Sequence, residues 1–242
     1  MSDAQAPAAA PTGPVLGIFA HPDDAEIAAG GTLAKWCAAG RSVHLLVLTN
    51  GDRGSNDRSR DRGELADTRL AETRAAAEVL GLASASVLGI HDGELENTAV
   101  IREAVVRRIR EVGAETVLSV DPTAWFFENR YYNHTDHRRT GEIALDAAFP
   151  GAGNPHFFPE HLSEGLEVRE IHDIWLGWTN ESNHIEDVSS FFETKIAALA
   201  KHDSQLTEGI RFFEEFLAKE AVDLGAKIGA SHAEEFRVLD LS

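Results

Sequence analysis

The sequence predicts one α/β domain in which helices cover both faces of a Rossmann-like, mostly parallel β-sheet. Short apolar segments alternate along the chain with segments of helical periodicity, which is the pattern of repeated strand–helix–strand units. The strand segments are almost continuously apolar, as expected for strands that are buried on both faces. With 242 residues, 43% of them hydrophobic, the chain is long enough for one substantial core, and no repeat or linker divides residues 15–242.

The first strand–helix–strand unit follows an N-terminal segment, residues 1–14, whose Ala- and Pro-rich composition predicts a disordered, flexible tail. The apolar run VLGIF begins a strand over residues 15–20. A helix is expected over residues 25–39, because Gly40 then supplies a typical helix end. The apolar segment at residues 42–49 completes the unit as a second strand.

The same alternation continues to about residue 150. A helix over residues 64–80 repeats apolar residues at helical spacing and ends at Gly81, and a strand follows at residues 86–90. The next expected elements are a helix over residues 99–112, a strand over residues 115–120 and a helix from His134 to just before Pro150. Repeated units of this kind predict the parallel sheet.

The alternation of predicted strands and helices is less regular beyond Pro150. After a loop rich in Pro, Gly and Phe, the expected elements are a strand at residues 170–177, helices at 188–201 and 205–225, and a short strand at 236–241. The second of these helices has a broad apolar face, which is typical of a helix docked on a sheet or on another subunit. A homo-oligomer is therefore possible.

Charge and cysteine content limit the partners and the compartment. The formal net charge of −18 at pH 7 would repel a phosphate backbone, so we expect no nucleic-acid partner. Cys37 is the single cysteine of the sequence and has no partner for an internal disulfide, which fits a reducing compartment. Because no long apolar run or secretory signal pattern is present, the sequence predicts a cytoplasmic protein with no membrane partner.

Polar loops follow four predicted strands at their carboxyl ends. In a parallel sheet these ends share one edge, and ligands bind in the crevice between the loops. The first loop contains AHPDDAE at residues 20–26, and the fourth contains NHTDHRR at residues 133–139; NGDRGS and IHDGE lie in the two loops between them. The first and fourth loops are the richest in side chains that ligate metals.

These two loops contain enough imidazole and carboxylate groups for a divalent metal site, in which catalytic zinc commonly takes three protein ligands and one water. The candidates are His21, Asp23, Asp24, His134, Asp136 and His137. Asp23 and Asp24 are adjacent on a non-helical turn, so their side chains point in different directions, and one can ligate while the other faces the water. His134 and His137 are neighbours on one helix face, so one can ligate while the other reaches the substrate.

Simpler roles are open for single residues of these loops. Asp24 could cap the first helix, with Glu26 interacting favourably with the helix dipole. A lone histidine in NHTDH would be more typical of the surface, and Asn133 or Thr135 could cap the helix that follows. Two such clusters at equivalent strand ends favour a metal site, because capping leaves the histidine and the other aspartate of the first loop unexplained.

HPDDAE followed by Gly30, Gly31 and Thr32, together with NHTDHRRTG, resembles the LmbE/PIG-L family of zinc-dependent N-deacetylases, which remove acetyl or related acyl groups from amino sugars such as N-acetylglucosamine. The resemblance covers most of the chain from Val15 and includes LTNGD, LGIHDGE, FPEHL and KIAALAKHDSQ. The pair of motifs is specific, whereas either motif alone would only be suggestive. Thr135 stands where the family more commonly has proline, which leaves the chemical positions intact.

The resemblance implies a zinc site with His21, Asp24 and His137 as ligands, although other divalent transition metals can share such ligands. It implies that Asp23 is the general base that takes a proton from the attacking water. The substrate implied by the family is a small N-acyl amino sugar or a related amide.

For the rest of the site, the resemblance implies that His134 stabilises the tetrahedral oxyanion with support from Asp136, and that Tyr132 assists at the carbonyl. Arg69 and Asp92 fall where sugar-recognising members of the family bind hydroxyl groups. From the residues alone, Arg69 could instead be a solvated helix charge, and Asp92 a turn residue.

Several residues outside the two motifs have open roles. Trp125, Phe126 and Phe127 lie on the same rim and could stack on a sugar, close over the site, pack in the core or contact another subunit. His184 and His202 are expected at the surface.

Three functions are open, in order of preference. The first is a zinc-dependent hydrolase of an N-acyl amino sugar or glycosylated metabolite. The second is a metal-dependent amidase that acts on a non-sugar amide or a thiol conjugate. The third is a non-catalytic Rossmann-like ligand-binding module, but the sequence lacks the G-x-G-x-x-G and G-K-[ST] motifs that cradle phosphates.

Overall fold

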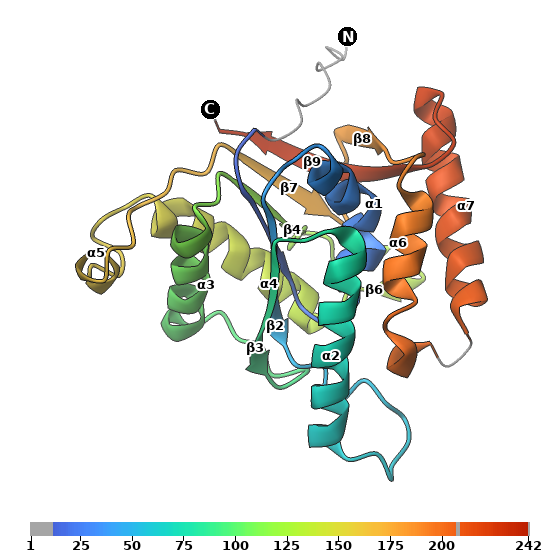
Figure 1. The fold of residues 1–242 in the computed structure, drawn as a ribbon, viewed down its shortest axis with the longest axis horizontal. Helices are drawn as coiled ribbons and strands as arrows, with labels where there is room; N and C mark the ends of the chain where they lie inside the picture. The colour runs from blue at the N-terminus through green and yellow to red at the C-terminus, as the bar shows by residue number, and fades with distance from the viewer. Residues whose placement is uncertain (1–11, 207–208, 242) are drawn as a thin grey trace.

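The computed structural model describes residues 12–206 and 209–241. Of the predicted tail, residues 1–14, the first eleven residues lie outside the described part of the chain. The strands are β1 (Val15–Phe19), β2 (Val43–Thr49), β3 (Ser84–Ile90), β4 (Thr116–Val120), β5 (Phe126–Phe127), β6 (Tyr131–Tyr132), β7 (Asp173–Gly177), β8 (His184–Asp187) and β9 (Ala233–Asp240). The α-helices are α1 (Asp24–Ala38), α2 (Arg62–Leu80), α3 (Ala99–Val112), α4 (Thr135–Asp146), α5 (Glu160–Ser163), α6 (Phe192–Leu199) and α7 (Ile210–Ile228). Within these residues, a seven-stranded sheet has the order β3-β2-β1-β4-β7-β9-β8, and β5 and β6 form a separate hairpin (Figure 1).

The large sheet is mostly parallel, as predicted. β1 pairs in parallel with β2 and β4, β2 with β3, and β4 with β7. β9 runs antiparallel to both β7 and β8 at one edge. The chain leaves β1 toward β2 on one side and leaves β4 toward β7 on the other. The boundary between the neighbouring strands β1 and β4 is therefore the topological switch point, where ligands bind in folds of this kind.

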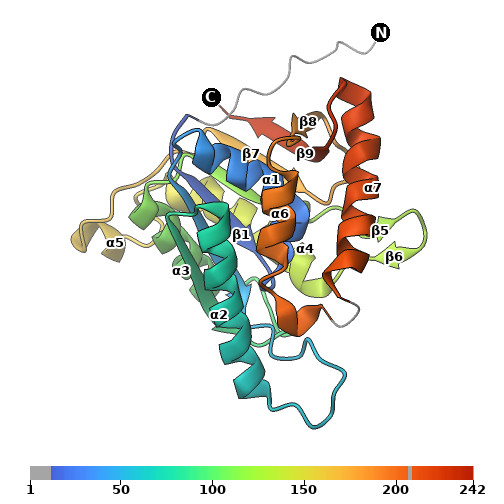
Figure 2. The same ribbon diagram turned by 45° about the vertical axis from the view of Figure 1, so that its right-hand side comes forward.

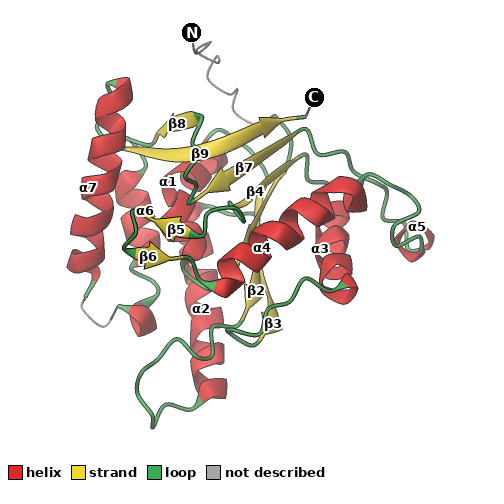
Figure 3. Cartoon of the chain, turned by 180° about the vertical axis from the view of Figure 1, so that it is seen from behind, coloured by secondary structure: helices red, strands yellow, loops and turns green. Residues whose placement is uncertain are grey.

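Helices cover both faces of the sheet, which also confirms the prediction (Figures 1 and 3). α1, α2 and α6 contribute to the core on one face, and α3 and α4 contribute to the core on the other. Val15 and Phe19 of β1 pack into the first core, whereas Leu16 and Ile18 pack into the second, since successive side chains of a strand point to opposite faces. Burial on both faces explains why the strand segments are apolar throughout.

α1, which follows the first polar loop, is bent at Ala29, where φ is −150° and ψ is 17°. Just after the bend, the amide groups of Gly31 and Thr32 donate to the Glu234 carboxylate of β9, at 3.0 and 2.8 Å. Lys195 of α6 donates to the same carboxylate at 2.6 Å. These contacts tie the helix behind the first loop to two distant elements, which fixes the position of that loop.

α7 lies at the edge of the molecule. Its Leu217 and Ala221 pack with residues of α6 in a third apolar cluster. Phe216 and Val222 of the same helix are exposed, so only part of its predicted apolar face is covered. Among the described helices, α7 included, none is both long and apolar enough to cross a membrane.

Several elements beyond residue 120 differ from the prediction. The helix expected from His134 to just before Pro150 is observed as α4, which ends at Asp146; the residues that follow, Ala147–Ala152, form an irregular turn in which the backbone of Phe149 is extended (φ −140°, ψ 128°). β7 and α6 are shorter than the predicted segments 170–177 and 188–201, and α7 is shifted toward the C-terminus relative to 205–225. The sequence did not predict β5, β6 and β8, because strands of two to four residues carry too little periodicity to detect.

The prediction that His184 and His202 lie at the surface is wrong. Their exposed fractions are 6% and 0%. Nε2 of His184 lies 2.8 Å from the carboxylate of Glu186, and Nε2 of His202 lies 3.4 Å from the carboxylate of Glu26 in α1. Burial of a histidine depends on carboxylates and apolar groups that packing brings to it, and the local sequence does not show them.

Candidate active site

The loops that follow β1 and β4 meet at the carboxyl edge of the sheet, next to the switch point. A cavity of about 260 Å³ opens there. It is lined by His21, Asp23, Arg69, Asp92, Tyr131, His134 and His137. The fold therefore brings most of the residues singled out in the sequence to one place.

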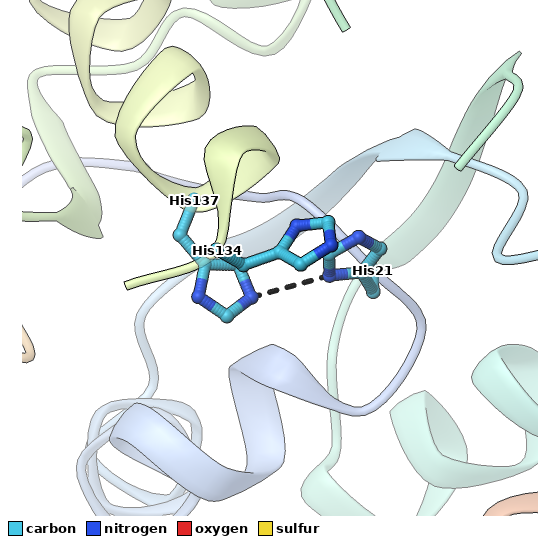
Figure 4. A group of neighbouring side chains, drawn as sticks. All are labelled: His21, His134 and His137. Atoms are coloured by element: carbon cyan, nitrogen blue, oxygen red, sulfur yellow. Dashed lines mark hydrogen bonds between the residues drawn. The ribbon is translucent and has the colours of Figure 1, made fainter. Parts of the chain in front are cut away.

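The ligand groups of three side chains lie close together beside this cavity. Nδ1 of His21 lies 3.2 Å from Nε2 of His137, and Figure 4 shows this contact together with the neighbouring His134. The Asp24 carboxylate is 3.3 Å from each of these two nitrogen atoms, through one oxygen apiece. In a tetrahedral site with metal–ligand distances of about 2.0–2.1 Å, ligand atoms lie about 3.3–3.4 Å apart. The three side chains therefore fit one divalent ion.

In His21 and His137, the two ring nitrogen atoms that face each other are the inner ones. The other nitrogen of each ring, the outer one, has a hydrogen-bond acceptor. Nδ1 of His137 donates to Oδ1 of Asn133 at 2.9 Å, because the amide nitrogen of Asn133 is itself engaged with a backbone carbonyl. Nε2 of His21 lies 3.3 Å from Asp136 and 3.4 Å from Asp92. When both rings are neutral, donation at these outer positions leaves lone pairs on the two inner nitrogen atoms. Two lone pairs and a carboxylate then converge, an arrangement that a bound cation would stabilise.

Other combinations in the same cluster could also surround a metal, namely His21, His134 and His137, or His21, Asp92, His134 and Asp136. These sets are looser, since Nε2 of His134 lies 4.0 Å from Asp92. Asp136 is also engaged by the amide of Gly93 at 2.7 Å, which suits a residue that orients a histidine ligand. His21, Asp24 and His137 are the tighter set.

Asp23 occupies the N-cap position of α1, and Asp24 is the first residue of the helix. The Asp23 side chain makes no capping hydrogen bond, and an Asp24 oxygen accepts from the amide of His21 at 2.8 Å, so helix capping explains neither carboxylate. The backbone of Asp23 has a φ of 105°, in a left-handed region that costs about 1–3 kcal/mol and is concentrated at functional sites. Its carboxylate lies 3.3 Å from Nη2 of Arg69 and lines the cavity.

The two adjacent carboxylates differ in their affinity for a proton. Burial raises the pKa of Asp23 to about 6; Arg69 lowers this pKa and Asp24 raises it. Burial also raises the pKa of Asp24, but His137 and His21 outweigh this effect and hold it well below the ordinary value. Asp24 therefore stays ionised, whereas Asp23 can gain and lose a proton; a cation at Asp24 would lower the pKa of Asp23 from this value.

Arg69 and Asp92 are both held by the loop that follows β2. Arg69 is 3% exposed, and its guanidinium donates to the carbonyls of Gly51 and Pro22, so the alternative that it is a solvated helix charge is wrong. The amide of Asp92 donates to Oδ1 of Asp52 at 3.0 Å, while its carboxylate lines the cavity. Both side chains are thus presented to the cavity on a fixed backbone.

His134 precedes α4, and its Nδ1 accepts from the amide of Asp136 at 3.2 Å. The neutral ring therefore carries its proton on Nε2. Burial lowers the pKa of His134 and His21 lowers it further, while Asp136 raises it. The Asp136 carboxylate, which we expected to support His134, lies nearer to His21, at 3.3 Å against 4.0 Å.

The tyrosine that lines the cavity is Tyr131 rather than Tyr132. The two are successive residues of β6, so their side chains point to opposite faces of the hairpin, and Tyr132 is 74% exposed. Asn133, which supports the ring of His137, was not predicted in this role from the sequence. The available signal was the spacing of four residues, which places both on one face at the start of a helix.

Fold and site together define a mixed α/β protein with a candidate centre for metal-dependent hydrolysis at the switch point of its sheet. Residues 16–148, more than half of the chain, match the family model of PIG-L, GlcNAc-PI de-N-acetylase. The chain belongs to this family, and the resemblance found in the sequence is confirmed.

Two relatives and one solved structure show how far the similarity extends. The chain is 35% identical over 224 residues to a diacetylchitobiose deacetylase of Thermococcus kodakarensis, covering 92% of this chain and 82% of that protein. It is 28% identical over 245 residues to a 1D-myo-inositol 2-acetamido-2-deoxy-alpha-D-glucopyranoside deacetylase of Rhodococcus erythropolis, covering 80% of this chain and 81% of that protein. The structure of N,N'-diacetylchitobiose deacetylase from Pyrococcus horikoshii with its inhibitor MPG matches with a TM-score of 0.85 and 32% identity, over 93% of this chain and 83% of that chain.

Proposed function

We propose that the protein is a metal-dependent hydrolase that removes an acetyl group from the nitrogen of an N-acetylglucosamine unit in a small sugar. The observation that carries this proposal is the convergence of His21, Asp24 and His137 beside a further carboxylate, Asp23, that faces the same cavity. The names of the two relatives, which designate deacetylases of diacetylchitobiose and of an acetamido sugar, support the substrate class.

Zinc is the metal that we propose for this centre. Two imidazoles and one carboxylate form a donor set that suits zinc in catalytic sites, where three protein ligands leave a position open. Other divalent first-row metals can use the same donors. When bound, the ion supplies Lewis acidity, which activates both water and the amide carbonyl.

The residues around the cavity have complementary proposed roles. Asp23 accepts a proton from the water that attacks the amide carbon, and Arg69 holds the Asp23 carboxylate in place. The Nε2–H group of His134 donates a hydrogen bond to the oxyanion that forms at that carbon. When the C–N bond breaks, the proton held by Asp23 passes to the departing nitrogen, so the products are acetate and a free amino sugar.

Substrate recognition is assigned to the other side chains of the cavity wall. The carboxylate of Asp92 is the proposed acceptor for a sugar hydroxyl, and Asp136 is proposed to orient His21. A contact between Arg69 and the sugar stays a prediction, because its guanidinium already has three protein partners. Assistance by Tyr132 at the carbonyl also stays a prediction.

Elemental analysis and an amine-release assay test the proposal together. We expect about one zinc per chain in the wild type. The same content is expected in His156→Ala, which removes an exposed histidine, whereas His137→Ala should lose both the ion and amine release from N-acetylglucosamine and N,N'-diacetylchitobiose. A wild type that binds no divalent metal after reconstitution would contradict the metal centre. Turnover of non-sugar amides or thiol conjugates, but of no acetylated sugar, would select the amidase instead.

A further inference from the structure

The β5–β6 hairpin lies beside the cavity, and neither Phe127 nor Tyr131 of this hairpin has a role in the proposed reaction. Phe127 pairs with Tyr131 and Phe126 pairs with Tyr132 across the hairpin. Directly opposed residues share a face and successive residues do not, so Phe127 and Tyr131 lie on one face, and Phe126 and Tyr132 on the other. Because Tyr131 lines the cavity, the Phe127–Tyr131 face is the one turned toward the site. Figure 2 shows the hairpin projecting at the edge of the molecule.

The two rings on the inner face form one surface. Their centroids are 6.1 Å apart and their planes are inclined by 30°, a stacked arrangement. Tyr131 is 54% exposed although it lines the cavity, so its ring contacts both the cavity and the solvent at its mouth. Trp125 and Phe126 are 53% and 63% exposed, so the alternative that the aromatic residues of this loop pack in the core is wrong for both.

The hairpin is fixed relative to the metal ligands. The amide of Asn133 donates to the carbonyl of Trp125 at 2.8 Å, and the Asn180 side chain donates to the carbonyl of Phe126 at 3.0 Å. The guanidinium of Arg138 lies 3.9 Å from the centroid of the Trp125 ring. Asn133 is also the residue that binds the ring of His137. The aromatic surface therefore has a defined position with respect to the reacting centre.

We propose that the Phe127–Tyr131 pair is a binding subsite for the second sugar ring of an N-acetylglucosamine disaccharide, next to the ring whose acetamido group is cleaved. This inference rests on the proposed function. The cavity, at about 260 Å³, is smaller than the ~300–1,000 Å³ of pockets that enclose drug-sized ligands, so it accommodates one ring. The next ring then lies at the mouth, where the C–H groups on the face of a pyranose can pack on the stacked aromatic pair.

The position of the pair favours a substrate over a second protein chain as its occupant. The inner face is continuous with the cavity through Tyr131, so a subunit seated on it would close the entrance to the site. A subunit seated on the outer face, with Phe126 and Tyr132, would not close this entrance, and the outer face is also the more exposed one. The hairpin therefore offers a matched control, because an aromatic ring can be removed from either face of the same strand pair.

The test compares kcat/KM for N,N'-diacetylchitobiose with kcat/KM for N-acetylglucosamine in each variant. We expect the ratio to fall by roughly three- to tenfold in Tyr131→Ala and in Phe127→Ala, mainly through KM for the disaccharide. Phe126→Ala should keep the wild-type ratio. Tyr131→Phe should also keep it, because the ring rather than the hydroxyl group forms the surface. Partial loss of folded protein lowers both rates equally and leaves the ratio unchanged.

The remaining outcomes overturn the subsite. A wild type that shows no preference for the disaccharide, or an equal loss for both sugars in Tyr131→Ala and Phe127→Ala, means that the pair does not bind a second ring. An equal change of ratio in Phe126→Ala and Phe127→Ala means that the hairpin acts only through its overall shape. If the wild type hydrolyses neither sugar, the proposed function itself fails, and the subsite fails with it.

Discussion

Asp23 and Asp24 are adjacent carboxylates with different surroundings, and this difference separates their proposed roles. Asp24 faces His21 and His137, whereas Asp23 faces Arg69 and the cavity. We expect Asp23→Asn to keep the metal and to lose about 10²–10⁴-fold in kcat, because an amide cannot accept the proton of the attacking water. Asparagine tolerates a left-handed backbone better than most residues, so the loop should keep its shape.

Asp24→Asn is the matched control, because it alters the neighbouring carboxylate and is expected to lose both metal and activity. Metal content and amine release are measured on both variants in parallel. Wild-type turnover in Asp23→Asn would show that another group takes the proton.

Asn133 is expected to act on metal affinity without contacting the ion. Its Oδ1 accepts from Nδ1 of His137, which keeps a lone pair on the inner nitrogen of that ring. We expect Asn133→Ala to weaken zinc binding by about 10–100-fold, measured by competition with a chromogenic chelator. Asn97→Ala, which removes an amide that donates to Asp146, should leave the affinity unchanged. Equal affinities in the two variants would mean that the tautomer of His137 is set in another way.

Residue type and spacing made part of the site predictable. The adjacency of Asp23 and Asp24 requires two directions for their side chains, and this follows from the local chain alone. The burial of Arg69 does not follow from it, because its partners belong to loops that reach α2 only in the folded molecule. The position of Tyr131 on the cavity depends on a hairpin of two-residue strands that has no sequence signal.

At the scale of the element, the packing of α1 against Val188 requires a glycine at position 31. A Cβ atom on Gly31 would lie 2.7 Å from Cβ of Val188, closer than two carbon atoms can approach without movement. We expect Gly31→Ala to lower the free energy of unfolding by about 1–3 kcal/mol, measured by urea denaturation. Gly177→Ala is the control, since its Cβ would lie 3.6 Å from Cβ of Ala28, an ordinary contact. Equal losses in both variants would show that the packing around Gly31 is not the reason for the glycine.

Helices and strands whose signals lie within their own sequence were predicted, whereas those that depend on pairing with distant segments were missed. The helix at Ala99–Val112 was predicted with its observed bounds, because its apolar spacing and the glycine that follows are both local signals. β8 was missed, because its four residues become a strand only by pairing with β9 from the end of the chain. The helix expected to end before Pro150 ends at Asp146, and the backbone is extended at Phe149, because a residue directly before a proline disfavours the helical conformation. The residues Ala147–Ala152 pack against α3.

At the scale of the whole molecule, the site joins two parts of the sheet that the chain builds separately. His21 and Asp24 come from the loop after β1, whereas His137 comes from the start of α4, after β4. β1 and β4 are neighbours, but about a hundred residues of chain separate their loops, and α1 and α4 pack on opposite faces. An ion held by all three side chains therefore bridges the switch point and stabilises only the folded arrangement.

Metal removal should consequently lower the thermal stability of the protein. A ligand present at about 100 times its Kd adds about 2.7 kcal/mol to the free energy of unfolding, which corresponds to roughly 5–10 °C in Tm for a chain of this size. We expect a chelator to lower the Tm of the wild type and of His156→Ala by this amount, measured by calorimetry. His137→Ala should unfold at the same temperature with and without the chelator, because the bridge between the two loops is already lost. A wild type whose Tm does not respond to metal would show that the three side chains do not hold an ion across the switch point.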